Sequence, residues 1–487
     1  MDSTTLSAVR DCLATGRGKD AVALLEVASR ASPDDPRLAH DRLLVATLFG
    51  NPADGRMALN AMTGLVERIG TTAAGAADLA ILSRDLADVV PLLLARFGSE
   101  ELAVHIPPVA EQVHRLLAAA ALLPHDPETA ALLARADALI WRYDDPRTRT
   151  RRYVYRPPSP HTVQIEPTNR CNLKCTMCPR TTEMQRPLVD MTVEDYAQLL
   201  AGWSGARPGF KARVHSFSSA VMDFTWPGFV KLFFLGEILM HESFIDLVHA
   251  TRARGAAVMP MTNGALLVRR SIRRKIVDSD MTHLGISLDG IDAASYEAVR
   301  TGAAWNAVRD AIIALCDELE AAGRRSSIAL HVNTLVPEGP GMAERNKEFL
   351  APILARVDSY GQTHVTAATH AASFVDAQGR LTPVIHAGRR IDAAEPSCLE
   401  TLTKLNVLSD GRMTPCCGDI DGVLELGRMR QTIDEVWNSP ATLALHRAHF
   451  THRLEDYDYC RHCLGVDVDP AIGLVPRLAL EGARPIG

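Results

Sequence analysis

The sequence has little net charge and no long apolar segment. Its 487 residues carry a formal net charge of −6, so no charge excess calls for nucleic acid or an anionic membrane as a partner. The most apolar stretches, near 89–95 and 116–123, are too short to span a bilayer. The N-terminal MDSTTLSAVRDCLATG has an early acid and lacks the apolar core of a secretory signal. These absences predict a soluble, cytoplasmic protein.

Residues 1–145 lack the Val/Ile alternation that is typical of strands. They are rich in Ala and Leu, with apolar residues at helical spacing, as in Ala21, Leu24, Leu25 and Ala28, which predicts an all-α domain of several antiparallel helices. The run from Gly18 to Gly50 resembles a tetratricopeptide helix pair, but no strict 34-residue period is visible. A tetratricopeptide-like domain and a plain helical bundle are both compatible with this pattern.

The rest of the chain divides into four further segments. Residues 146–160 are basic and end in prolines, which favours a solvated linker. Residues 161–370 alternate short β-type runs with helical stretches, which predicts βαβ units around a parallel sheet. Residues 371–397 are assigned as a connector, and 398–487 as a small C-terminal domain with a hairpin at 405–415. The strands are expected at 162–166, 230–235, 256–261, 283–288, 327–336 and 363–367, and the helices near 192–203, 242–254, 265–278, 292–300, 306–322, 342–356, 432–437 and 440–449.

A first group of cysteines follows the first predicted strand of the βα series. Cys171, Cys175 and Cys178 have the spacing Cys-x3-Cys-x2-Cys, and in a reducing compartment clustered cysteines are more often metal ligands than disulfides. Three thiolates can hold three irons of a [4Fe–4S] cluster and leave the fourth iron open for a substrate group. The alternative, a zinc site, usually needs four ligands, and no fourth ligand lies at knuckle spacing, although His161 lies upstream.

A second group of cysteines lies near the C-terminus. Cys398, Cys416, Cys460 and Cys463 would bring distant segments together around either a closed zinc site or a fully ligated [4Fe–4S] cluster. Cys417 is left over: it is a small buried neighbour, an alternative ligand to Cys416, or a hydrogen donor to a substrate radical. The two other cysteines are assigned to the core (Cys316) and to no function (Cys12).

The first cysteine group and the motifs after it resemble the radical S-adenosylmethionine (SAM) superfamily. The motifs are EPTNRCNLKCTMCPR, Leu235-Gly236-Glu237 where the family has a GGE-like sequence, MTNGALL at 261–267, ISLDG at 286–290 and YEAVRTG at 296–302. The resemblance implies a partial (β/α)6 barrel that binds a [4Fe–4S] cluster and SAM. It implies cofactor-binding roles for Met177 near adenine, Glu237 near the SAM amino group, Ser287 and Asp289 near the ribose, and Arg300 near the carboxylate. Gly236 and Asn263 are also assigned to cofactor binding.

The second cysteine group resembles a SPASM/Twitch domain. SDGRMTPCCGDIDG, LGRMRQTIDEVWNSPATLALHR and CRHC carry this resemblance, which implies that Cys398, Cys416, Cys460 and Cys463 hold an auxiliary [4Fe–4S] cluster. The full SPASM pattern needs further cysteines, and none follows Cys463, which favours the shorter Twitch form. The two resemblances together imply reductive cleavage of SAM, hydrogen abstraction from a C–H bond, and an electron donor of the flavodoxin or ferredoxin type.

The substrate-handling residues are predicted by position only. His215, His241 and His331 are candidate proton acceptors, and Cys417 is the candidate hydrogen donor. The insertion at 205–229 is aromatic-rich and is expected near the barrel mouth, either as a lid or as a loop that docks on the helical domain.

The leading hypothesis is a radical SAM oxidoreductase or epimerase that acts on a natural-product intermediate. The first alternative is a ribosomal-peptide maturase whose helical domain binds peptide or a partner protein, although no β-containing leader-binding module is recognisable at the N-terminus. The alternative of another class is a non-catalytic metal-binding scaffold, against which the cysteine triplet and Glu237 argue. No nucleic-acid or membrane partner is expected.

Overall fold

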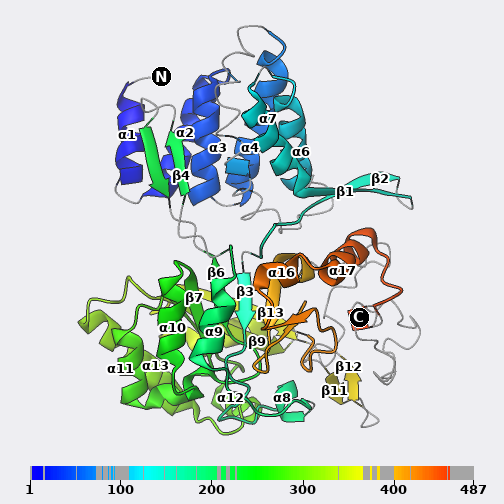
Figure 1. The fold of residues 1–487 in the computed structure, drawn as a ribbon. Coiled ribbons are helices and arrows are strands. Elements are labelled where there is room, and N and C mark those ends of the chain that lie inside the picture. Colours follow the sequence, from blue (N-terminus) through cyan, green and yellow to red (C-terminus); the bar gives the residue numbers. More distant parts are fainter. Residues whose placement is uncertain are drawn as a thin grey trace. The chain divides into compact units, whose positions relative to one another are not determined.

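The computed structural model divides the chain into two compact units (Figure 1). Unit 1 is Met1–Pro158 with Gly209–Trp226, and unit 2 is Ser159–Pro208 with Pro227–Gly487. The residues that the structure describes are 3–14, 17–50, 52–72, 79, 86, 89–90, 93, 109–123, 125–146, 149–160, 162–182, 184–205, 210–214, 220–224, 228–337, 339–365, 373–375, 381–383, 400–416, 418–457 and 459–460.

Unit 1 is built mainly from helices, as the sequence predicts. They are α1 (Ser3–Ala14), α2 (Gly18–Ala31), α3 (Pro36–Phe49), α4 (Pro52–Ile69), α6 (Val109–Ala120) and α7 (Pro127–Ala138). Helix α3 begins where the Asp35 carboxylate accepts the backbone N–H groups of Arg37 and Leu38, with proline in the first turn. Each helix packs against the next along the chain. None of the described helices of the chain is long and apolar enough to cross a membrane.

Unit 1 also contains a hairpin where the sequence predicts the end of an all-α domain and a linker. Strands β1 (Ile140–Asp145) and β2 (Thr150–Tyr155) pair antiparallel. Asp144 and Arg151 are directly opposite and form an exposed ion pair. Ile140 and Tyr155 at the open end of the hairpin join the helical core, and Tyr153 packs against it. The basic sequence lacks the apolar alternation that marks a half-buried strand, which is why the sequence predicts a linker here.

Unit 2 contains the predicted parallel sheet. Three strands from the C-terminal part of the chain, β13 to β15, extend it. The order in the described residues is β10-β9-β8-β7-β6-β3-β13-β14-β15, parallel from β10 to β13. The strands are β3 (Thr162–Ile165), β6 (Phe229–Leu232), β7 (Ala257–Thr262), β8 (His283–Ser287), β9 (Ala329–Pro337), β10 (Ser359–Val365), β13 (Lys404–Val407), β14 (Arg412–Thr414) and β15 (Gly427–Arg428). A separate pair, β11 (Ser373–Val375) and β12 (Leu381–Pro383), lies in the predicted connector.

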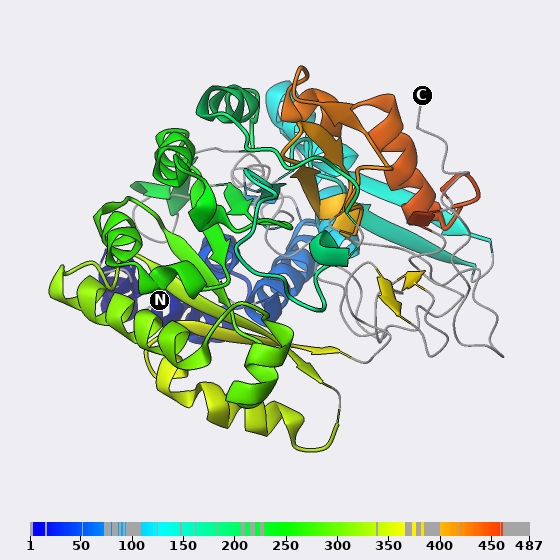
Figure 2. The ribbon, with the colours of Figure 1, turned by 90° about the horizontal axis from the view of Figure 1, so that it is seen from below.

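Helices alternate with these strands and cover one face of the sheet (Figure 2). They are α8 (Pro179–Thr182), α9 (Val193–Ala201), η1 (Ile238–Met240), α10 (Phe244–Ala253), η2 (Ala265–Val268), α11 (Arg270–Asp278), α12 (Ala293–Val299), α13 (Trp305–Ala321), α14 (Met342–Leu354), α15 (Glu400–Thr403), α16 (Ile433–Trp437) and α17 (Pro440–Thr451). Alternate strand residues such as Val230, Leu284 and Leu330 join the helices in one core. Their neighbours therefore face the inner side of the sheet, as a partial (β/α)6 barrel requires.

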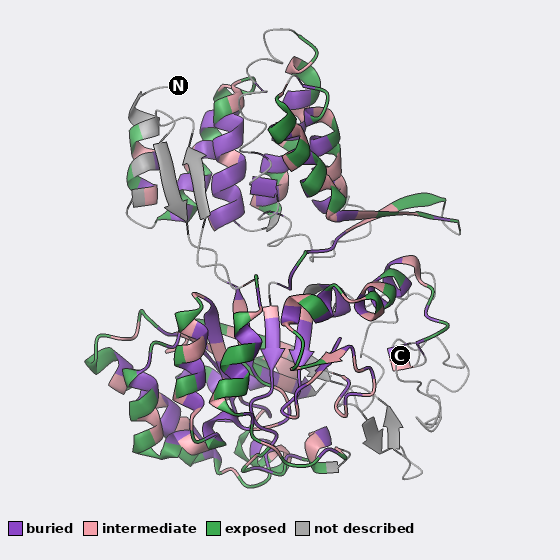
Figure 3. Cartoon of the chain, viewed as in Figure 1, coloured by how far each residue is buried: buried purple, intermediate pink, exposed green. Residues whose placement is uncertain are grey.

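The C-terminal hairpin is part of the same sheet. Strand β13 lies parallel to β3, with Lys404 opposite Thr162 and Val407 opposite Ile165, and both strands are buried (Figure 3). The sequence predicts this hairpin as part of a small C-terminal domain. Its strands continue the sheet of the barrel within one compact unit.

The insertion between α9 and β6 is grouped with unit 1 and not with the barrel. It contains a hairpin of β4 (Phe210–Val214) and β5 (Ala220–Phe224), which groups with unit 1. It enters β6 at that strand's N-terminal end, whereas the cysteine loop leaves the C-terminal end of β3, the parallel neighbour of β6. The lid and the docking-loop interpretations of this segment both stay predictions.

In unit 2, the segments next to the boundaries with unit 1 are joined by hydrogen bonds. The Asp434 carboxylate accepts the Ser159 hydroxyl at 2.5 Å and the Ser204 N–H at 2.9 Å. The Trp203 indole N–H donates to the Pro160 carbonyl at 2.7 Å. A methyl group on Gly228 would lie 2.3 Å from the Gly205 carbonyl oxygen, so these backbones touch.

Candidate active site

The cysteine loop is held against the end of helix α12. The N–H groups of Lys174 and Thr176 donate to the carbonyls of Thr301 and Val299, each at 3.0 Å. These two bonds flank Cys175 and turn it toward the helix end. The loop therefore has a defined backbone position before any ligand is considered.

The loop brings three free thiols into one electrostatic neighbourhood. Cys175 is buried, and Cys171 and Cys178 are partly buried. Burial raises the pKa of each thiol above its usual value, and each is raised further by another thiol of the trio. No group of three His, Cys, Asp or Glu in the described residues is arranged to hold a single ion. A four-iron cluster does not need that arrangement, because each thiolate binds a different iron.

Gly236 lies against the backbone of the cysteine loop. A methyl group at this position would come 1.8 Å from the Thr168 carbonyl oxygen, and the Glu237 N–H donates to the Arg170 carbonyl at 2.8 Å. The loss of the first glycine of the family motif is tolerated locally, because the Leu235 side chain is buried and its N–H bonds to Glu166 at 3.3 Å. The glycine that remains is the one that this contact requires.

Glu237 is buried and joins the ends of two strands. Its carboxylate accepts the Thr262 hydroxyl at 2.7 Å, the Asn263 N–H at 2.8 Å and the Leu239 N–H at 3.2 Å. Burial raises its pKa, and these hydrogen bonds oppose the rise. Glu237 therefore caps η1, and it also interacts electrostatically with Cys171.

Asn263 connects the third strand of the barrel to the cysteine loop. Its side-chain N–H lies 3.8 Å from the Cys171 sulfur and donates to Asn172 Oδ1 at 3.1 Å. Its Oδ1 accepts the Ala265 N–H at 2.9 Å. The structure thus brings Asn263, Glu237 and the first cysteine together, as the resemblance implies.

Asp289 and Arg300 form a buried ion pair behind Cys175. Asp289 Oδ2 accepts Arg300 at 2.7 Å through Nε and at 2.6 Å through Nη2, while Oδ1 accepts the Leu335 N–H at 2.8 Å. Arg300 also hydrogen-bonds Cys175 and opposes the rise of its pKa. Both carboxylate oxygens of Asp289 already have partners within the protein. A contact of Asp289 with the ribose, which the resemblance implies, stays a prediction.

Tyr296 is a residue that sequence reasoning missed as a functional candidate. Its side chain is buried, and its hydroxyl has no hydrogen-bond partner among the described residues. It lies one helical turn before Arg300 and interacts electrostatically with Cys175. A buried unpartnered hydroxyl beside a thiol trio suits a polar group bound at the loop, so the donor set and this atom both fit a SAM-binding iron–sulfur cluster.

The remaining predicted residues occupy different places. Met177 is partly exposed on the loop, and Ser287 ends β8 on the inner face, opposite Asn333 of β9. His241 is buried: its Nδ1 accepts the Ser243 N–H at 3.2 Å and its Nε2 contacts the carbonyl of Met191 at 2.9 Å. Both ring nitrogens are occupied, so His241 is poorly suited to accept a proton from a substrate.

His331 lies on the inner face of the barrel. It is opposite Gly285 in the register, two residues before the Ser287–Asn333 pair. Its Nδ1 bonds the Ser359 hydroxyl at 2.5 Å, and its ring stacks on His283 at 5.3 Å. Its Nε2 has no partner in the part of the chain that the structure describes.

The second cysteine group is only partly within the described residues. Cys398, Cys417 and Cys463 lie outside them, as does His215. The segments of Cys416 and Cys460 converge: the Tyr459 hydroxyl donates to the Gly418 carbonyl, and a methyl group on Gly418 would lie 3.7 Å from both the Cys416 sulfur and the Tyr459 oxygen. A hydrogen bond therefore joins the two segments that carry these predicted auxiliary ligands.

The parallel sheet with a thiol trio at its C-terminal edge defines the radical SAM fold. Residues 165–332 match the model of the Radical SAM superfamily, and residues 398–464 match that of SPASM, an iron–sulfur cluster-binding domain. The chain therefore contains a Radical SAM domain followed by a SPASM domain, the domain pair of a radical SAM enzyme of the SPASM type. The first domain implies a SAM-binding [4Fe–4S] cluster and SAM, and the second implies auxiliary iron–sulfur chemistry.

Solved structures resemble the chain at low identity. BtrN in complex with AdoMet and 2-DOIA is 15% identical, covering 62% of this chain and 91% of BtrN, with a TM-score of 0.36. Streptococcus suis SuiB bound to S-adenosylmethionine is 13% identical, covering 69% of this chain and 77% of SuiB, with a TM-score of 0.42. The curated proteins contain no match to the chain. Scores this low say nothing about the substrate.

Proposed function

We propose that this enzyme abstracts a hydrogen atom from a C–H bond of a natural-product intermediate and leads it to oxidation or epimerisation. When bound, SAM and its cluster supply the radical chemistry that no side chain can provide. The protein must hold one C–H bond close to that chemistry and keep water out. The inner face of the barrel, beneath the cysteine loop, is where its own residues do this.

The inner face carries polar groups at the level of the loop and just below it. Ser287, the last residue of β8, is opposite Asn333 in the middle of β9, and Asn333 is exposed. His331 precedes Asn333 by two residues, which is about 7 Å along a strand. A small polar substrate that contacts Ser287 and Asn333 would therefore bring its lower side toward His331.

The observation that carries the proposal is the unpartnered Nε2 of His331. Burial lowers the pKa of His331, so its imidazole is neutral near pH 7 and can act as a base. A substrate alcohol that has lost a C–H hydrogen atom becomes a carbonyl by losing one proton and one electron. His331 is assigned the proton, and taking the electron is the chemistry that the second cluster supplies when bound.

Anaerobic reconstitution tests the class of reaction. About eight irons per chain are expected from two four-iron clusters, with 5′-deoxyadenosine released when SAM and dithionite are added. Offering C-deuterated aminocyclitols and a C-deuterated peptide then identifies the substrate class by the deuterium that reaches 5′-deoxyadenosine. Transfer from the peptide alone would contradict a small-molecule substrate, and a lack of SAM cleavage would favour the non-catalytic scaffold.

His331 has its own test within that assay. His331→Gln removes the base and should lower product formation at least tenfold, while SAM cleavage and iron content stay near those of the wild type. The matched control is His249→Gln, because His249 is exposed on α10 and pairs with Asp280. Equal product formation in the two variants would remove His331 from the mechanism.

The peptide-maturase alternative is supported by the composition of unit 1. This unit groups the β1–β2 hairpin and the inserted β4–β5 hairpin with the helices. Strands can bind an extended peptide by strand addition, and the sequence alone offered no β-containing element for this purpose. Binding of a labelled precursor-type peptide that is lost when residues 209–226 are replaced by a short Gly/Ser linker would favour this function.

A further inference from the structure

The two cysteine-bearing segments diverge from one point in unit 2. Strands β3 and β13 run side by side in parallel, and the Glu166 N–H extends the ladder by donating to the Val407 carbonyl at 2.8 Å. Beyond this point one chain leads to Cys171, and the other passes Ser409 and leads to Cys416. Whatever joins Glu166 to Ser409 therefore fixes how the two segments leave the sheet.

The Glu166 carboxylate makes that connection. Oε2 accepts the Ser409 N–H at 3.0 Å and its hydroxyl at 2.9 Å. Oε1 accepts the Leu235 N–H at 3.3 Å, two residues before Glu237. One carboxylate thus touches the strand before the SAM-cluster loop, the glycine motif and the C-terminal hairpin.

Arg186 closes the arrangement from the far side of the cysteine loop. It donates to both oxygens of Glu166, at 2.8 Å and 3.1 Å, and its Nε donates to the Ile420 carbonyl at 2.6 Å. The adjacent Gln185 N–H donates to Asp421 Oδ1 at 2.9 Å. Because Ile420 follows Cys416 by four residues, Arg186 ties the segment after the first cysteine group to the segment around the second.

This ion pair is a poor device for stability alone. The side chains of Arg186 and Glu166 are only 2% and 1% exposed, and desolvating two charges offsets most of their attraction. Apolar residues of similar size often replace such a pair without loss of stability. The bidentate guanidinium–carboxylate geometry does give direction and register, and every other partner of the pair lies on a segment that leads to a site motif.

We propose that Glu166 and Arg186 are positioning residues that set the auxiliary-cluster segment in register with the SAM-cluster loop and the Leu235–Glu237 motif. The pair acts through backbone groups and touches no reacting atom. Its consequence is a fixed separation between the two clusters when they are bound. This inference rests on the presence of two iron–sulfur sites and is independent of the substrate and of His331.

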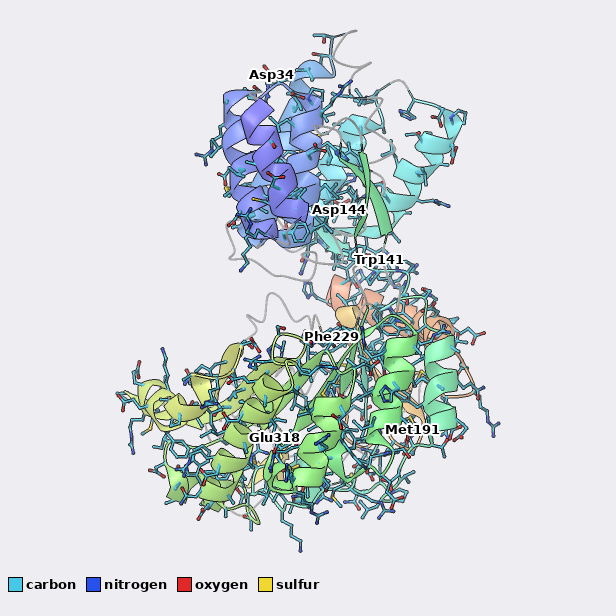
Figure 4. The ribbon with its side chains drawn as sticks, turned by 90° about the vertical axis from the view of Figure 1, so that its left-hand side faces the viewer. Asp34, Trp141, Asp144, Met191, Phe229 and Glu318 are labelled. Atoms are coloured by element: carbon cyan, nitrogen blue, oxygen red, sulfur yellow. The ribbon has the colours of Figure 1, made fainter. Side chains whose placement is uncertain are left out.

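The metal-free protein provides the first test. Glu166→Met/Arg186→Met removes both charges at nearly constant volume, so the variant should fold with an unfolding midpoint near that of the wild type. The amides of Leu235 and Ser409 lose their acceptor and should exchange hydrogen about five- to tenfold faster, as expected for one lost hydrogen bond. The matched control is Arg273→Met/Glu318→Met, which removes an ion pair between α11 and α13 (Glu318 is labelled in Figure 4).

The reconstituted protein provides the second test, without any substrate. Pulsed electron paramagnetic resonance of the dithionite-reduced enzyme should show one sharp inter-cluster distance in the wild type and the control, and a broadened distribution in the Glu166/Arg186 variant. The KM for SAM should rise more than the rate of SAM cleavage falls. Unchanged amide exchange, or an unchanged distance distribution, would overturn the proposal.

A milder variant covers the case in which the double variant does not fold. Arg186→Lys keeps the charge but cannot bond both Glu166 oxygens and Ile420 at once. The same local amide acceleration and the same broadening are expected, and wild-type values would overturn the proposal. An iron content near four per chain would count against the two-cluster assignment. Amide exchange in the metal-free protein would then still show whether the Glu166–Arg186 pair holds the two cysteine-bearing segments in register.

Discussion

Gly236 touches Thr168: a methyl group on Gly236 would lie 1.8 Å from the Thr168 carbonyl oxygen. Real carbon atoms do not approach backbone oxygen so closely, so Gly236→Ala must displace the cysteine loop. We expect a folded protein whose iron content falls from about eight to about four per chain, with 5′-deoxyadenosine formation reduced at least tenfold. Gly64→Ala in helix α4 is the control, since only the end of the Arg68 side chain lies near it. Full iron loading of Gly236→Ala would contradict the contact.

Asp289→Asn should destabilise the protein and disturb the cluster loop together. The substitution leaves the Arg300 charge buried without its carboxylate, a change that costs about 3–5 kcal/mol in comparable cases. Chemical denaturation of the metal-free protein measures this cost. Asp278→Asn breaks an exposed pair with Arg274 and should cost less than about 1 kcal/mol. An equal loss of unfolding free energy in both variants would show that the buried Asp289–Arg300 pair contributes no more to stability than an exposed pair.

Tyr296→Phe should be harmless to the metal-free protein, because the hydroxyl has no partner among the described residues. The free energy of unfolding is expected to stay equal or to rise by about 1 kcal/mol, since an unsatisfied buried group is removed. In the reconstituted enzyme the SAM-binding cluster should become harder to reduce, because hydrogen bonds near a cluster raise its reduction potential. An equilibrium redox titration followed by electron paramagnetic resonance measures this, and an unchanged potential would separate Tyr296 from the cluster.

His449 should make the stability of the chain sensitive to mild acid. Burial, with repulsion from His452, lowers its pKa from 6.5 to about 4. The unfolded chain therefore binds the proton more readily, and stability present above pH 6.5 is lost as the pH falls toward about 4. The loss is at most about 3 kcal/mol. His449→Gln should flatten this part of the profile of unfolding free energy against pH, while parallel profiles would exclude His449 as the source.

Much of the barrel and its first site could be predicted because their signals are local. The predicted strands at 162–166, 230–235, 256–261, 283–288 and 327–336 all overlap strands of the structure, whereas β10 begins four residues before its predicted start and β4 and β5 are not predicted. The cysteine loop follows the end of its strand. Glu237, Asn263 and Arg300 are brought to that loop because the C-terminal ends of parallel strands share one edge of the sheet.

The rest depends on pairings between distant segments, which a single sequence does not encode as a period. Nothing in Lys404–Val407 identifies β3 as its neighbour, and the motif that Glu166 opens gives no sign that its carboxylate pairs with Arg186. In the sequence, Tyr296 resembles any aromatic residue of a helix. Only the structure shows that its buried hydroxyl has no partner among the described residues. His241 and His331 look equivalent in sequence, and only their hydrogen bonds separate them.

The hairpin β4–β5 makes unit 1 a discontinuous unit, with Ser159–Pro208 of unit 2 between its two parts. During synthesis the ribosome therefore releases the cysteine loop before it releases the last strands of the helical unit. The first unit can be completed only after Trp226 has emerged, by which time the thiols of Cys171, Cys175 and Cys178 are already outside the exit tunnel. An isolated fragment that stops at Pro158 would therefore lack part of unit 1.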